Sequence, residues 1–136
     1  MPPLLLDTCA AIWLMQDDLI PSALDALDAA AQAGVATYIS PITAWEVGQL
    51  VARGRLEILM TPHRWFARLC EAPGVSLAPL SPELLIAASF LPGKLSRDPA
   101  DRILAATARD LGATLITRDR ALLDYGAAGH ISVLAC

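Results

Sequence analysis

Four acidic residues stand at places in the sequence where their carboxylates can take part in metal-assisted chemistry. Asp7 and Asp119 each follow a short apolar run, whereas Glu46 and Asp101 lie in the first turns of predicted helices. Carboxylates that converge on one site repel one another, and burial raises that cost, so a cation is the usual remedy. Oxygen ligands without histidine or cysteine select hard ions such as Mg²⁺ or Mn²⁺. Such ions can activate water for an in-line displacement at a phosphoryl group.

The helix that carries Asp101 has a clear beginning in the sequence. Within the stretch 96–108, Pro99 suits the first helical position, because its missing N–H would have no partner there. Asp98 then becomes the N-cap and Asp101 the third helical residue, where a carboxylate suits the helix dipole. Capping is a sufficient role for Asp98, whereas Asp101 has three other acids that it can meet. The buried stripe of this helix is predicted to comprise Ile103, Leu104 and Leu111.

Short apolar runs alternate with helical segments along the whole chain. This alternation predicts an α/β fold in one domain, residues 1–136, with a parallel sheet covered on both faces. Strand ends and the starts of the following helices then share one edge of the sheet, so all four carboxylates can converge there. Strands are predicted at 4–6, 35–39, 113–116 and 131–134, with a strand or extended segment at 75–80. Helices are predicted at 10–14, 21–33, 41–53, 62–70, 82–90 and 99–111, with a short one after Asp119.

Several of these side chains also have purely structural interpretations. Asp7 or Thr8 can cap the helix that begins beside them, and Glu46, among apolar neighbours, can be a helix-surface residue. Thr117 can bond a carboxylate or a metal-bound water, or it can be an ordinary strand residue. A rim of cations that faces phosphate, each of them otherwise merely solvated, is predicted to comprise Lys94, Arg97, Arg118 and Arg120.

The overall composition restricts the class of protein. The formal net charge of −4 argues against a protein that grips nucleic acid with its whole surface, but it allows a local basic rim. Cys9, Cys70 and Cys136 lack metal-ligand spacing, and we expect reduced thiols, with Cys9 and Cys70 as small apolar fillers. No apolar run approaches the length of a membrane span, and the N-terminus resembles no export signal, which predicts a cytoplasmic protein.

Taken as an ordered set, the motifs resemble those of a known family, the PIN-domain ribonucleases. The resemblance rests on Asp7-Thr8 after an apolar strand, Glu46 in its helix, the run Asp98-Pro99-Ala100-Asp101-Arg102, and Thr117-Arg118-Asp119-Arg120. The length and the Asp-Pro-x-Asp-Arg form resemble the VapC-type toxins of bacterial toxin–antitoxin pairs, over nearly the whole chain. The resemblance implies a three-layer α/β/α fold around a central, mostly parallel sheet of four to five strands.

The same resemblance implies an activity, its residues and its partners. The implied reaction is endonucleolytic cleavage of RNA, in which water activated by Mg²⁺ or Mn²⁺ attacks the phosphodiester. The implied partners are a small antitoxin that docks at the active-site groove and a second copy in a homodimer. The implied catalytic quartet is Asp7, Glu46, Asp101 and Asp119, with the metal on Asp7, Asp101 and Asp119 and with Glu46 as ligand or water-orienting group. The implied accessory residues are Thr8, Asp98 and Thr117.

One departure and several alternatives accompany this interpretation. Relatives in the family often carry a histidine just before the Arg-Asp-Pro run, where this chain has Ser96, so no histidine role carries over. A haloacid-dehalogenase-type phosphatase would need a second Asp two residues after Asp7, where Cys9 stands. A phospho-receiver domain would need an acidic pair before its first helix. The remaining alternative is a PIN-like module that binds RNA or protein without turnover.

Overall fold

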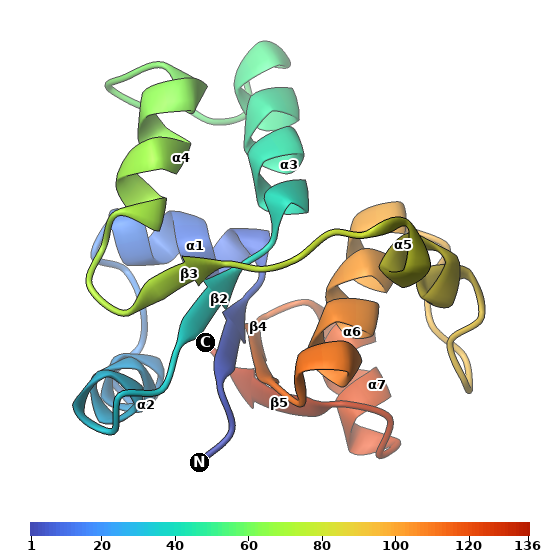
Figure 1. Cartoon of the computed structure of the whole chain (residues 1–136). Helices are drawn as coiled ribbons and strands as arrows, with labels where there is room; N and C mark the ends of the chain where they lie inside the picture. Colours follow the sequence, from blue (N-terminus) through green and yellow to red (C-terminus); the bar gives the residue numbers. More distant parts are fainter.

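The computed structural model describes residues 1–136 and centres on one sheet (Figure 1). Its strands are β1 (Leu4–Leu6), β2 (Thr37–Ile39), β3 (Val75–Leu77), β4 (Thr114–Thr117) and β5 (Ser132–Ala135). Their order across the sheet is β3-β2-β1-β4-β5, and every neighbouring pair is parallel. The prediction of an α/β fold with a mostly parallel sheet of four to five strands is confirmed.

Seven helices connect and cover the strands, and a proline begins five of them. Proline suits a first helical turn, and a Ser, Thr or Asp side chain caps four of these five helices. None of the helices combines the length and the apolar character that crossing a bilayer requires. The helices are α1 (Thr8–Met15), α2 (Pro21–Gln32), α3 (Pro41–Ala52), α4 (Pro62–Cys70), α5 (Pro82–Ser89), α6 (Pro99–Leu111) and α7 (Arg120–Ala127).

The alternation of side chains along β1 assigns the helices to two faces of the sheet. Leu4 and Leu6 belong to a core shared with α1, α2, α3 and α4, whereas Leu5 belongs to a core shared with α6 and α7. Helix α5 packs on α6, and α3 and α4 run side by side (Figure 1). These layers are the three-layer α/β/α arrangement that the sequence resemblance implied.

The structure corrects three details of the sequence analysis. Strand β3 ends at Leu77, because Pro79 follows shortly and cannot donate a ladder hydrogen bond. The first helix begins at Thr8 rather than two residues later, since Asp7 caps it. The expectation that Cys9 is an apolar filler is wrong, because Cys9 is exposed.

Because β1 is buried on both faces, its side chains should dominate the stability of the fold. We predict that Leu5→Ala lowers the free energy of unfolding by about 2–5 kcal/mol, since Leu5 has no exposed surface. The matched control Leu59→Ala removes the same atoms from a side chain that is 104% exposed. It should change stability by less than about 0.5 kcal/mol. Urea unfolding followed by circular dichroism measures both variants, and equal losses would contradict the assigned core.

Candidate active site

Asp7 lies buried where β1 gives way to α1, and both of its carboxylate oxygens are engaged. One oxygen accepts a hydrogen bond from the backbone N–H of Ala10 at 2.8 Å, which caps α1. The other oxygen accepts a hydrogen bond from the Thr117 hydroxyl at the end of β4. The Thr117 oxygen in turn accepts from the backbone N–H of Asp119 at 3.0 Å. Thr117 therefore ties Asp7 to the segment that carries a second predicted site acid.

Glu46 is held by a short relay of hydroxyl groups. The Thr8 hydroxyl donates to the Glu46 carboxylate, so the hydroxyl of Thr43, 3.1 Å from that of Thr8, must donate to Thr8. The interpretation of Glu46 as a helix-surface residue is wrong, because its side chain is half-buried and bonded across to α1. Sequence reasoning missed Thr43, whose one signal is its place on α3, one turn before Glu46.

The other acids of this edge lie at the starts of α6 and α7. Asp98 caps α6 by accepting from the backbone N–H of Asp101 at 3.1 Å, and Asp119 caps α7 through the backbone N–H of Leu122 at 3.0 Å. The Ser96 hydroxyl donates to Asp101 at 3.1 Å. Asp98 and Asp101 thus occupy the cap and the third helical position, as the sequence predicted.

Three acids at this edge of the sheet, Asp7, Glu46 and Asp101, have raised pKa values. Burial, and then the negative charges of Asp119 and Asp98, raise the pKa of Asp101 to about 7. Burial is also the main cause of the raised pKa values of Asp7 and Glu46, and the charge of Asp119 adds to both. The charge of Asp119 therefore reaches each of the other three predicted catalytic acids.

No protein cation neutralises these carboxylates directly. The one ion pair within 4 Å in the molecule joins two exposed residues of α7, Arg120 and Asp124, at 3.5 Å. Arg118 lies with its guanidinium carbon 3.5 Å from the centre of the Trp13 ring, and its Nε donates to the carbonyl of Cys136 at 3.0 Å. Of the four cations predicted to form the rim, Arg118 and Arg120 therefore already have protein partners. The other two, Lys94 and Arg97, are exposed on the segment before α6.

The donor set at this edge suits a hard divalent cation. Its members are carboxylates with raised pKa values, and their mutual repulsion is what a bound Mg²⁺ or Mn²⁺ would relieve. As they stand, no three acid, histidine or cysteine side chains are arranged to hold a metal ion. The acids therefore fit the ion in chemistry, and the side chains would have to come closer together to bind it.

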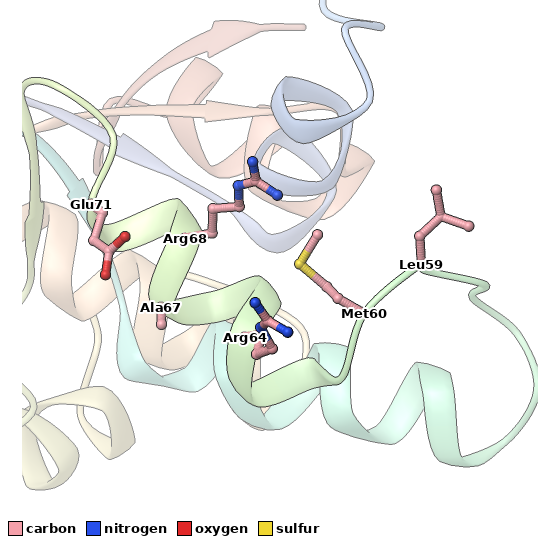
Figure 2. A pocket seen from close by; sticks show the side chains of 6 residues that line it. All are labelled: Leu59, Met60, Arg64, Ala67, Arg68 and Glu71. Atoms are coloured by element: carbon pink, nitrogen blue, oxygen red, sulfur yellow. The ribbon is translucent and has the colours of Figure 1, made fainter.

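A separate hollow of about 670 Å³ lies along α4 and contains none of the predicted site residues. Figure 2 shows Leu59 and Met60 on the segment before α4, with Arg64 and Arg68 projecting from the helix itself. These two arginines belong to no ion pair, although Glu71 lines the same hollow. The hollow is a surface feature apart from the acidic edge.

Comparisons with known proteins identify the family of this chain. The PIN domain model matches residues 4–128. Ribonuclease VapC22 of Mycobacterium tuberculosis (strain ATCC 25618 / H37Rv) is 31% identical over 127 residues, which cover 92% of this chain and 93% of that protein.

Two crystal structures share the fold at low sequence identity. VapBC2 from Rickettsia felis, bound to a DNA fragment from their promoter, gives a TM-score of 0.71 at 14% identity over 97% of both chains. FitAcB from Neisseria gonorrhoeae gives a TM-score of 0.55 at 19% identity over 96% of both chains. The family resemblance found in the sequence is confirmed, and the chain belongs to the PIN-domain family, of the VapC type.

Proposed function

We propose that this protein is a metal-dependent endoribonuclease and the toxin of a toxin–antitoxin pair. The observation that carries the proposal is the acidic edge of the sheet, where Asp7, Glu46 and Asp101 have raised pKa values and no cationic partner. Membership of the PIN-domain family and 31% identity to a ribonuclease support RNA as the substrate. Hydrolysis of a phosphodiester is the reaction that such a cluster of oxygen ligands serves.

Asp7, Asp101 and Asp119 would hold Mg²⁺ or Mn²⁺, with Glu46 as a further ligand or as the group that orients water. The bound ion would supply positive charge against the phosphate and lower the pKa of water. Thr117 keeps the Asp7 carboxylate in place through its hydroxyl group.

Two accessory residues orient the remaining acids. Thr8, supported by Thr43, aims the carboxylate of Glu46. Asp98 caps α6 and so fixes the helical turn from which Asp101 projects.

Cations around the acidic edge would contact the RNA phosphates. Lys94 and Arg97 are exposed just before α6, and Arg120 begins α7 next to Asp119. The Nε of Arg118 donates to the Cys136 carbonyl, and the face of its guanidinium lies on the Trp13 ring. Its terminal nitrogens would therefore contact a phosphate. These contacts would hold the RNA against an otherwise acidic protein.

The proposal extends to assembly and location. Residues 1–136 would act as a single nuclease domain in the cytoplasm. A cognate antitoxin would bind at the active-site groove and block it, and two copies of the toxin would form a homodimer.

The acids of the proposed site should be required for RNA cleavage. We predict that the purified, antitoxin-free protein cuts a structured RNA pool in Mg²⁺ or Mn²⁺ but not in EDTA. Asp7→Asn and Asp101→Asn should each reduce the rate by roughly a hundredfold or more, because each removes an oxygen charge from the ion. Asp28→Asn, on the exposed side of α2, is the matched control and should cut normally.

Two outcomes would contradict this mechanism or the activity itself. Cleavage that survives both Asp7→Asn and Asp101→Asn would reject the acidic site. RNA binding without cleavage, by folded and metal-loaded protein, would favour the inert binding module.

The raised pKa of Asp101 predicts how stability depends on pH in metal-free protein. Folded Asp101 keeps its proton up to about pH 7, whereas the unfolded chain loses it near 3.8, so stability should fall as pH rises through this window. Urea unfolding in EDTA at pH 5 and pH 8 measures the fall, and Mg²⁺ should restore stability at pH 8. Asp98→Asn should make the fall smaller, since Asn still caps a helix but no longer repels Asp101. If the Asp101→Asn variant shows the same pH dependence of stability as wild type, Asp101 is not the group responsible for it.

A further inference from the structure

The side chain of Arg102, directly after Asp101, joins three backbone carbonyls. Its Nε donates to the carbonyl of Ala88 at 2.8 Å, and one terminal nitrogen donates to the carbonyls of Leu95 and Ser96, at 3.3 Å each. Ala88 lies in the last turn of α5, where helix carbonyls have no partner within the helix and favour a cation. The guanidinium therefore links the end of α5 to the segment that leads into α6.

Arg102 acts through this fork of hydrogen bonds and not through an ion pair. It forms no ion pair within 4 Å, although acids precede it on the same helix. Its side chain is half-buried against α5, which packs on α6. A planar guanidinium can reach carbonyls on both sides at once, whereas a lysine ammonium is a point donor that cannot span them in the same way.

The segment that Arg102 holds, residues 91–98, is also held at its other end. The Tyr125 hydroxyl donates to the carbonyl of Pro92. Gly93 has a φ of +68° and lies so close to the His130 ring that an added Cβ would stand 2.3 Å from Nε2. Lys94 lies in this segment, between Gly93 and the carbonyls that Arg102 holds. Further along, the Ser96 hydroxyl donates to the Asp101 carboxylate.

We infer that Arg102 is a positioning residue for RNA cleavage, an inference that rests on the proposed function. Its fork fixes the 91–98 segment, and the segment in turn holds the Ser96 hydroxyl on Asp101 and carries the exposed Lys94 and Arg97. Arg102 would touch neither the RNA nor the metal. It would determine where Lys94, Arg97 and one oxygen of Asp101 stand.

The test compares Arg102→Met with Arg109→Met, a matched control at the other end of α6. Arg109 also donates to a backbone carbonyl, that of His130 at 2.6 Å, but outside the 91–98 segment. Tryptic cleavage after Lys94 and Arg97, which are exposed on this segment, should quicken by roughly tenfold in metal-free Arg102→Met and stay unchanged in Arg109→Met. Arg102→Lys, which keeps the charge but not the fork, should lie between wild type and Arg102→Met.

Kinetics and binding give the functional half of the test. In Arg102→Met we expect KM for RNA to rise severalfold as Lys94 and Arg97 lose their positions, together with a lower kcat from the loosened Asp101. RNA binding in EDTA, measured in an Asp7→Asn background, should weaken by a similar factor for Arg102→Met and not for Arg109→Met. Ser96→Ala should lower kcat while leaving KM near that of wild type, because it removes only the hydroxyl group on Asp101.

The outcomes separate this inference from the proposed function. Equal tryptic cleavage after Lys94 and Arg97 in Arg102→Met and Arg109→Met would overturn the inference, even if the wild-type protein cleaves RNA. Unchanged KM and RNA affinity in a well-folded Arg102→Met protein would overturn it as well. A wild-type protein that does not cleave RNA would refute the proposed function, and the comparison of tryptic cleavage would still decide what Arg102 holds.

Discussion

The whole site depends on the level at which three parallel strands end. Leu6 of β1 pairs with Ile39 of β2 on one side and with Ile116 of β4 on the other, so these strands reach one edge of the sheet together. A register shift of one residue would turn every side chain of a strand to the opposite face and expose its apolar set. The apolar core that fixes the register therefore also fixes how close Asp7 comes to Thr117.

At this edge the same carboxylates stabilise helices and remain available for chemistry. Asp7, Asp98 and Asp119 each cap a helix by accepting a backbone N–H, and each lies at the positive end of a helix dipole. These dipoles offset part of the repulsion that such a concentration of acids creates. Burial, and then the charges of neighbouring acids, still raise the pKa values of Asp7 and Asp101. In the proposed function, a bound cation would relieve this repulsion.

Local sequence signals were sufficient for the elements but not for the contacts between them. Alternating apolar runs and capped prolines predicted the strands, most of the helices and the place of Asp101 in α6. The burial of Glu46 was not predictable in this way, because its partner Thr8 lies 38 residues away and meets it only when α1 approaches α3. The contact of Arg118 with the Trp13 ring also joins residues far apart in the chain. Sequence analysis therefore predicted Arg118 only as a cation of the rim.

Cys9 stands at the rim of the acidic edge, and its surroundings decide how it meets oxidants. The residue is exposed, yet its thiol is partly covered, and this burial together with the charges of Asp7 and Glu46 raises the pKa of the thiol to about 11. Oxidants and alkylating agents react with thiolate rather than thiol, so at neutral pH almost none of Cys9 is in the reactive form. Burial and the neighbouring acids thereby protect this exposed cysteine, beside the proposed site, from oxidation and alkylation.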